Sequence, residues 1–225
     1  MPQKFNYIDF SKEIISLPRK SASLSKDRYI SEDFMKMEWE GIWTKTWLFA
    51  GIEADIKEIG DFFVYDIGRE SIVITRDESE KISAFYNVCQ HRGNKIVTLE
   101  SGSFNKISCP YHGWSYALDG KLEHVPDREL FEGGVPCDEK SLKPVRVSVW
   151  AGLIFINMNE DSPSLETFLG PIIEQLKPYK FEKMNLVKHQ TVDVLETNWK
   201  TVRDNFLEQY HVDFIHPQHA SFVDC

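Results

Sequence analysis

The chain has 225 residues, of which 42% are hydrophobic, and its formal net charge at pH 7 is −9. This excess of acidic residues argues against nucleic acid as a partner, because binding to phosphates depends on clustered Lys and Arg. The longest apolar stretch, Val149–Ile156, is far shorter than the roughly 20 residues of a membrane-spanning helix, and no charged-then-apolar leader opens the chain. We therefore expect a cytoplasmic protein that contacts neither nucleic acid nor a membrane.

Residues 1–46 are expected to form an N-terminal helical segment. Ser31 is a typical N-cap residue, and Glu32 and Asp33 carry the negative charge that favours the first turn of a helix. From Phe34 to Trp47 the apolar residues recur at helical intervals. This pattern predicts a helix over 34–47 and a first domain boundary near residue 46.

Residues 47–160 have the composition of an antiparallel β domain. Short runs rich in β-branched and aromatic residues alternate with Gly and Asp-Gly turns, which is typical of strands joined by tight connections. The expected strands are 47–52, 62–67, 72–75, 82–88, 107–108 and 114–117. Residues 145–158 are expected to close the domain as a last strand or as a hairpin that bends at Gly152.

Residues 161–225 have a different pattern. Apolar residues between 165 and 176 fit a helix that is interrupted near Gly170-Pro171, and 186–195 is expected to be a strand. Residues 198–211 fit a further helix, whose aromatic side chains Phe206 and Tyr210 are expected to pack inward. The chain is therefore predicted to be an α+β protein with boundaries near 46 and 160.

Two loops of the predicted β domain each contain one cysteine and one histidine. Cys89 and His91 form a Cys-x-His pair, and after 17 intervening residues Cys109 and His112 form a Cys-x-x-His pair. A Rieske-type [2Fe–2S] cluster needs two thiolates and two imidazoles, which these loops supply. Two alternatives are a Cys₂His₂ zinc site, which usually pairs Cys with Cys and His with His along the chain, and a disulfide between Cys89 and Cys109, which leaves both histidines unexplained.

A second group of candidate ligands follows in the last thirty residues or so. If 198–211 is helical, Asp204, Glu208 and His211 share one face at spacings of four and three. His216 comes five positions later, just before a proline that ends any helix. Two histidines with a carboxylate are the common ligands of a mononuclear non-haem iron. Taken alone, a His near a Glu on a helix is more often a solvated or hydrogen-bonded pair.

Together these residues resemble the motifs of the Rieske non-haem iron oxygenases, the aromatic ring-hydroxylating type. The run CPYHGW around Cys109 and His112 is similar to the form found in that family. Asn-Trp-Lys, an acid–Asn pair and then an acid-x-x-His-x₄-His run are similar to its catalytic-domain signature. The resemblance implies an antiparallel β Rieske domain over 47–160, followed by the start of a helix-grip catalytic domain over 161–225.

The resemblance also implies roles for individual residues. The two Cys-His loops would hold the Rieske [2Fe–2S] cluster, and His211 and His216 would bind a mononuclear Fe(II). Glu208 matches the acid that in this family hydrogen-bonds a Rieske histidine of the neighbouring subunit, here His112, and Asn205 matches an asparagine near the iron. The bridging acid is usually Asp, whereas oxygenases of quaternary ammonium substrates also have Glu at this position.

The family's third iron ligand is a carboxylate further downstream, and neither Asp213 nor Asp224 is expected to replace it. We therefore expect a chain truncated within the catalytic domain of an oxygenase α subunit. By resemblance, a reductase or ferredoxin supplies electrons to the cluster, and one electron crosses a subunit boundary to the iron. O₂ is activated there to hydroxylate an aromatic or other small organic substrate. The expected full-length assembly is a homotrimer or an α₃β₃ complex.

Three other functions are weighed against the oxygenase. A stand-alone Rieske electron carrier needs only the β domain, and leaves 34–47 and 198–216 without a purpose. An inactive oxygenase fragment would assemble the cluster without a complete iron site. A zinc-binding interaction module would be colourless. Iron analysis separates them, because a carrier or an inactive fragment binds two irons per chain and an oxygenase binds three.

Overall fold

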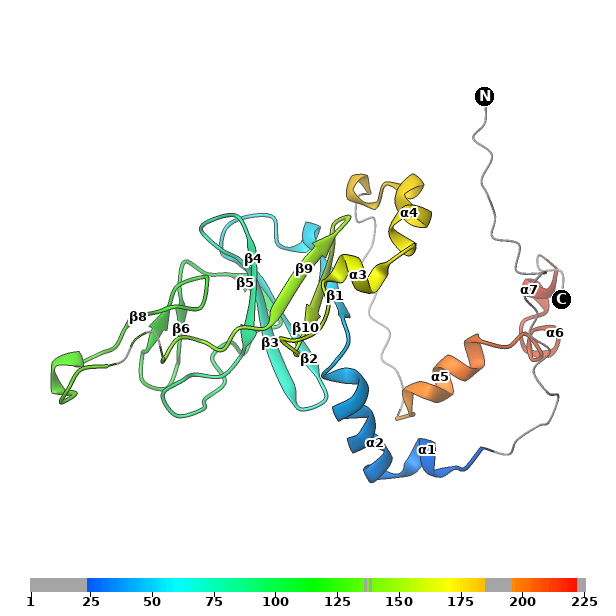
Figure 1. Ribbon diagram of the computed structural model, residues 1–225, viewed down its shortest axis with the longest axis horizontal. Helices are drawn as coiled ribbons and strands as arrows, with labels where there is room; N and C mark the ends of the chain where they lie inside the picture. The colour runs from blue at the N-terminus through cyan, green and yellow to red at the C-terminus, as the bar shows by residue number, and fades with distance from the viewer. Residues whose placement is uncertain (1–23, 136, 138, 185–195, 222–225) are drawn as a thin grey trace. The chain divides into compact units, whose positions relative to one another are not determined.

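The computed structural model describes residues 24–135, 137, 139–184 and 196–221. The chain divides into two compact units, which we describe separately. The sheet unit is Lys36–Asp193, and the helical unit combines Met1–Met35 with Val194–Cys225. Figure 1 shows the strands gathered in the sheet unit. The boundaries near 46 and 160 stay predictions.

The sheet unit contains three antiparallel sheets within the described residues. The first has the order β1-β10-β9, formed by β1 (Leu48–Ile52), β9 (Arg146–Trp150) and β10 (Leu153–Asn157). The second has the order β4-β3-β2-β5, formed by β2 (Asp61–Ile67), β3 (Glu70–Arg76), β4 (Ile82–Tyr86) and β5 (Ser101–Ser103). The third has the order β6-β7-β8, formed by β6 (Ile107–Ser108), β7 (Ser115–Tyr116) and β8 (Leu122–His124).

The strands predicted between 47 and 117 are all present, and the hairpin expected over 145–158 turns at Ala151 and Gly152 between β9 and β10. The α+β fold class is confirmed. Two strands were missed, β5 and β8. The residues of β5, Ser-Gly-Ser, are all exposed and pair with one edge of β2, so no hydrophobic alternation marks them. β8 has three residues, which is too short for a period to show.

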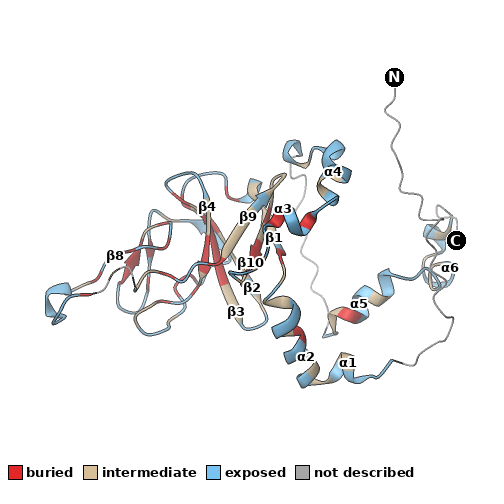
Figure 2. Cartoon of the chain, in the orientation of Figure 1, coloured by how far each residue is buried: buried red, intermediate tan, exposed pale blue. Residues whose placement is uncertain are grey.

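The middle of β3 separates two hydrophobic cores. Ile72 and Ile74 point into a core shared with the β1-β10-β9 sheet, whereas Val73 between them joins a core with the two cysteine loops. Successive side chains of a strand point to opposite faces, so a strand buried on both faces reads as a continuous apolar run. Figure 2 shows this burial in the strands. One face of the second sheet therefore packs against the two cysteine loops.

The described helices are short. The α-helices are α1 (Asp27–Ile30), α2 (Glu32–Glu38), α3 (Leu165–Leu169), α4 (Ile172–Leu176), α5 (Trp199–Phe206), α6 (Val212–Ile215) and α7 (Pro217–Ala220). A π-helical segment covers Trp39–Trp43, and single 3₁₀ turns cover Glu53–Asp55, Arg128–Leu130, Lys177–Tyr179 and Phe181–Lys183. Across the described ranges, no helix reaches the length and hydropathy needed to span a bilayer.

The helix expected over 34–47 begins earlier and changes character midway. Ser31 is its N-cap, because the Phe34 N–H donates to the Ser31 hydroxyl at 3.3 Å. After α2 the helix widens into the π segment, where the Thr44 N–H and hydroxyl both donate to the Trp39 carbonyl, at 3.1 and 3.0 Å. The predicted break near Gly170-Pro171 separates α3 from α4. The strand expected over 186–195 lies outside the described residues.

Candidate metal centres

Two ligand loops, residues 89–94 and 109–114, have the same backbone geometry. In each, the cysteine N–H donates to the carbonyl five residues later, and the cysteine carbonyl accepts from the glycine N–H four residues later. These N···O distances are 2.9 and 2.9 Å in the first loop and 2.8 and 3.0 Å in the second. Gly93 and Gly113 have φ of +75° and +70°, a region that glycine adopts without the steric cost of a Cβ. The two Cys-His pairs are thus presented by matching turns.

The two thiols lie at the buried end of these loops. Cys89 and Cys109 are 2% and 3% exposed, and both are free thiols, so the disulfide alternative is wrong. Burial raises the pKa of the Cys89 thiol, hydrogen bonds from Tyr116 and the His91 backbone partly lower it, and the adjacent Cys109 thiol raises it further. Both cysteines belong to the same hydrophobic core cluster.

The two imidazoles lie at the outer end. The ring centroids of His91 and His112 are 4.7 Å apart at an interplanar angle of 70°. The Nδ1 atom of His91 is buried and has no hydrogen-bond partner among the residues that the structure describes. Burial, and then the neighbouring His112 and Arg92, lower the pKa of His91. A neutral imidazole with an unpartnered buried nitrogen is the form that binds a metal, so these residues fit a Rieske cluster.

The arrangement of the donors favours two irons over one zinc. Within the described part of the chain, no three His, Cys, Asp or Glu side chains converge on a single metal position. A Cys₂His₂ zinc site needs four donors around one ion. A [2Fe–2S] cluster of the Rieske type takes two thiolates on one iron and two imidazoles on the other. One thiol and one imidazole from each of two matching loops suit the second arrangement better than the usual zinc pattern.

Aromatic rings cover both histidines. Trp114 stacks on His91 with centroids 4.8 Å apart and planes 8° apart, and Tyr111 lies 3.9 Å from His112. The guanidinium of Arg92 lies 5.7 Å from the Tyr111 ring centroid. His112 itself is exposed, so the histidine end of the site faces solvent in this chain.

Sequence reasoning missed Tyr116, which is completely buried beside the first thiol. Its hydroxyl lies 3.3 Å from Cys89 Sγ and accepts the Gln90 N–H at 3.1 Å. Burial raises the pKa of Tyr116 well above its usual range, so the hydroxyl stays protonated and can donate a hydrogen bond to the sulfur. Period-two alternation offered a signal, because Tyr116 follows Trp114 by two positions and shares its face.

The second candidate centre lies in the helical unit, and its helix is shorter than expected. The helix expected over 198–211 ends at Phe206, the last residue of α5. Glu208 then caps the next turn, because its carboxylate accepts the His211 N–H at 3.3 Å and lies 2.5 Å from His211 Nδ1. The next helix, α6, begins only after His211, which is its N-cap residue. The prediction of one continuous helix is therefore wrong.

The histidines of the second centre are close together. The rings of His211 and His216 are 5.4 Å apart, and His219, to which the sequence assigned no role, lies 5.2 Å from His216. Asp213 belongs to no three-residue metal-binding group in the described ranges, and Asp224 lies outside them. A third carboxylate ligand is thus not found among the described residues.

The side chains around this centre are largely exposed. Phe206 and Tyr210 are 81% and 89% exposed, so the expectation that they pack inward is wrong for this chain. Asn205, on α5, is also exposed. Figure 2 shows the same exposure over α6.

The N-terminal segment holds α5 within the helical unit. The Tyr29 hydroxyl donates to Asp204 at 2.6 Å, and the Asn198 side-chain amide donates to the Tyr29 carbonyl at 3.1 Å. The Tyr29 hydrogen bond keeps the pKa of Asp204 below its usual range. The ammonium of Lys200, a buried residue, lies 5.2–5.8 Å from three aromatic ring centroids. These rings belong to Tyr29, Phe34 and Trp199.

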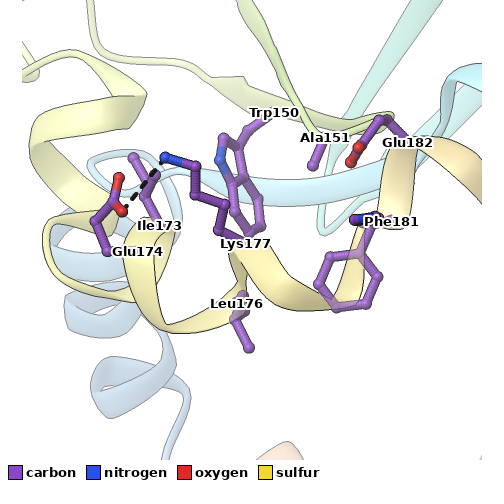
Figure 3. Close-up of a pocket in the computed structure, with 9 residues that line it drawn as sticks. Trp150, Ala151, Ile173, Glu174, Leu176, Lys177, Phe181 and Glu182 are labelled. Carbon is purple, nitrogen blue, oxygen red and sulfur yellow. Dashed lines mark hydrogen bonds and ion pairs between the residues drawn. The ribbon is translucent and has the colours of Figure 1, made fainter. Parts of the chain in front are cut away.

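A separate pocket of about 210 Å³ lies beside the β9–β10 turn (Figure 3). The rings of Trp150 and Phe181 meet edge to face with centroids 6.2 Å apart, and Lys177 pairs with Glu174 at 3.5 Å. Cysteines and histidines are absent from its described lining. None of the residues proposed as ligands of the two candidate centres is therefore among its lining residues.

Two protein-family models match this chain, one over each group of candidate ligands. Residues 46–137 match the Rieske [2Fe–2S] domain, and residues 181–225 match the ring-hydroxylating alpha subunit catalytic domain. The chain is 34% identical over 203 residues to the glycine betaine monooxygenase oxygenase subunit of Pseudomonas aeruginosa, covering 88% of this chain and 46% of that protein. The chain therefore spans about half the length of this relative.

Solved structures show the same similarity. The quaternary ammonium Rieske monooxygenase CntA in complex with L-carnitine aligns with a TM-score of 0.81 at 32% identity, over 88% of this chain and 56% of that one. Naphthalene 1,2-dioxygenase from Rhodococcus sp. bound to indole aligns with a TM-score of 0.74 at 30% identity, over 84% of this chain and 44% of that one.

Proposed function

The chain belongs to the Rieske non-haem iron oxygenases, and we propose that it acts in the oxygenase component, the α subunit, of a system that hydroxylates a small organic molecule with O₂. The observation that carries the proposal is the pair of matching ligand loops, with two buried thiols and a buried imidazole nitrogen that has no hydrogen-bond partner among the described residues. We assign the [2Fe–2S] ligands to these loops and the iron ligands to the helical unit. They are Cys89, His91, Cys109 and His112 for the cluster, and His211 and His216 for the iron.

When bound, the cluster stores and passes on single electrons, and the mononuclear iron supplies the open positions for O₂ and substrate. The residues of the chain set the conditions for this chemistry. The buried ends of the loops keep water away from Cys89 and Cys109, and Tyr116 offers a hydrogen bond to Cys89. His112 is exposed, so a partner could approach the bound cluster from the histidine end.

We assign Glu208 the bridging role between two subunits. Its carboxylate hydrogen-bonds His211, one of the proposed iron ligands, which supports one half of the bridge. The other half would be His112 of a neighbouring copy, which requires a homotrimer or an α₃β₃ assembly. Asn205 would line the iron site, and a ferredoxin or reductase would supply the electrons. The match over 181–225 argues against a stand-alone electron carrier.

We propose a small quaternary ammonium compound, rather than an aromatic ring, as the substrate. Glycine betaine and L-carnitine appear in the names of a relative and of a solved structure with the same domains. Glu208, where the family usually has Asp, is consistent with that group. Naphthalene dioxygenase is also similar, so a planar apolar substrate is the competing class.

Metal analysis and turnover test the proposal. We expect two irons and two sulfides per chain after anaerobic reconstitution, with the electron paramagnetic resonance (EPR) signal of a reduced Rieske cluster, and loss of the cluster in Cys89→Ser. A further iron that disappears in His211→Ala would support the mononuclear site. O₂-dependent oxidation of glycine betaine or carnitine in the presence of a reductase would support the activity. A colourless protein that binds zinc would contradict the assignment.

A further inference from the structure

Asn87 is a buried polar residue two positions before Cys89, and it is 1% exposed. Its side-chain oxygen accepts the N–H groups of Ile96 and Val97 at 3.0 and 2.8 Å. Its side-chain nitrogen donates to the Val97 carbonyl at 2.7 Å and to the Ser71 hydroxyl at 3.2 Å. One carboxamide therefore ties the chain that enters the first ligand loop to the chain that leaves it.

The second ligand loop is closed in a different way. There β6 and β7 pair directly, with Ser108 opposite Ser115 and their hydroxyls 3.0 Å apart. The first loop has one isolated bridge, Val88 with Lys95, in the equivalent place. The Asn87 carboxamide accepts two backbone N–H groups of the departing chain and donates to one of its carbonyls, as backbone groups of a neighbouring strand would.

We propose that Asn87 is a positioning residue for the [2Fe–2S] cluster. Its carboxamide replaces the missing strand pairing and so gives the first loop the geometry that pairing gives the second. The inference rests on the proposed function, because the consequence of misplacing this loop is a change at the cluster. Without the carboxamide, the backbone groups of Ile96 and Val97 lose their hydrogen-bond partners and need new ones. The backbone that follows the turn with Cys89 and His91 is then no longer held in place.

The chain provides a matched control in Asp77, which is also buried. Its carboxylate accepts the N–H groups of Ser79 and Lys81 at 2.8 and 3.1 Å and the Ser83 hydroxyl at 2.9 Å. It therefore holds the turn between β3 and β4 in the same way that Asn87 holds the first ligand loop. Asp77→Ala tests what the loss of a buried loop-holding side chain does when that loop carries no proposed ligand.

The experiment compares the reconstituted wild-type chain with Asn87→Ala and Asp77→Ala by EPR of the reduced cluster and by iron release to a chelator. We expect both variants to unfold at lower temperature. Only Asn87→Ala should shift the g values and release iron faster, by about tenfold. Asn87→Asp keeps an oxygen for the two N–H groups but loses the donor. Its iron-release rate and g values should therefore lie between those of the wild-type chain and those of Asn87→Ala. If Asn87→Ala does not fold, Asn87→Asp decides by the same criteria.

Two outcomes overturn the inference alone, provided that the wild-type chain gives a Rieske signal. One is an unchanged spectrum and iron-release rate in the decisive Asn87 variant. The other is the same spectral shift in Asp77→Ala, which would mean that general loosening of the sheet unit is responsible. A wild-type chain without a Rieske signal would instead overturn the proposed function, and this inference with it.

Discussion

Replacement of Tyr116 by phenylalanine isolates one hydrogen bond to the proposed cluster. The ring is completely buried, so phenylalanine preserves its packing and removes only the hydroxyl 3.3 Å from Cys89 Sγ. Adding an electron makes a cluster and its sulfurs more negative, so a donated hydrogen bond stabilises the reduced state more than the oxidised one. We therefore expect Tyr116→Phe to lower the reduction potential.

The size of the change follows from the strength of such a bond. A hydrogen bond to a charged group contributes about 1.5–3 kcal/mol. Only the part that differs between the two oxidation states affects the potential. If that part is about 1–1.4 kcal/mol, the shift for one electron is roughly 40–60 mV, since about 59 mV corresponds to a tenfold change in the equilibrium constant. The Gln90 N–H also loses its acceptor, which lowers stability by about 1 kcal/mol.

Redox titration followed by EPR measures this shift. Tyr65→Phe is the matched control, because Tyr65 is a partly buried tyrosine that packs against the other hydrophobic core of the sheet unit. The reduction potential of Tyr65→Phe should equal that of the wild-type chain. A potential that is unchanged or higher in Tyr116→Phe would refute the argument that this hydroxyl donates to the sulfur.

Three further changes test other contacts. Trp114→Ala removes a buried ring from the core and should lower the free energy of unfolding by about 3–5 kcal/mol, as measured by urea denaturation. A loss below about 1 kcal/mol would contradict the packing of Trp114 in this core. The Tyr29 hydrogen bond lowers the pKa of Asp204, so this hydrogen bond stabilises the fold fully above the unfolded pKa of about 3.9, and the stabilisation is lost as pH falls through the folded pKa. Asp204→Asn should therefore weaken the dependence of the unfolding free energy on pH in this acidic range. An unchanged pH dependence would contradict the Tyr29–Asp204 hydrogen bond. Glu208→Gln should leave the cluster EPR signal unchanged but slow the O₂-dependent reoxidation of the cluster in the assembled oxygenase. The reason is that the Glu208 carboxylate, hydrogen-bonded to His211, is the proposed bridge between subunits. Reoxidation at the wild-type rate would contradict the bridging role of Glu208.

The sequence predicted the strands well because their signals are local. In β3 the apolar run from Ile72 to Thr75 reflects burial on both faces, and strand propensity depends on such burial. The hairpin of β9 and β10 was predicted because Gly152 marks its turn. The two Cys-His loops were found because ligand spacing is also a local property.

The rest depends on contacts between distant residues. Asn87 and Tyr116 act through side chains that reach across the fold to Val97 and Cys89, and no spacing rule connects these positions. The helix over 198–211 was overextended because Glu208 has good helix propensity but instead caps the following turn. In that segment a side-chain hydrogen bond overrides the periodicity of apolar residues.

The asymmetry of burial assigns the two ends of the first centre different tasks. The thiol end lies in a core where Asn87 and Tyr116 are fully buried, so each hydrogen bond there acts in a low dielectric and has a large effect on the relative energies of the oxidation states. The histidine end is open, with His112 exposed and the Tyr111 ring tilted against it. Changes at the thiol end should therefore alter the reduction potential, whereas changes around His112 should alter the rate of electron exchange with a partner and leave the potential nearly constant.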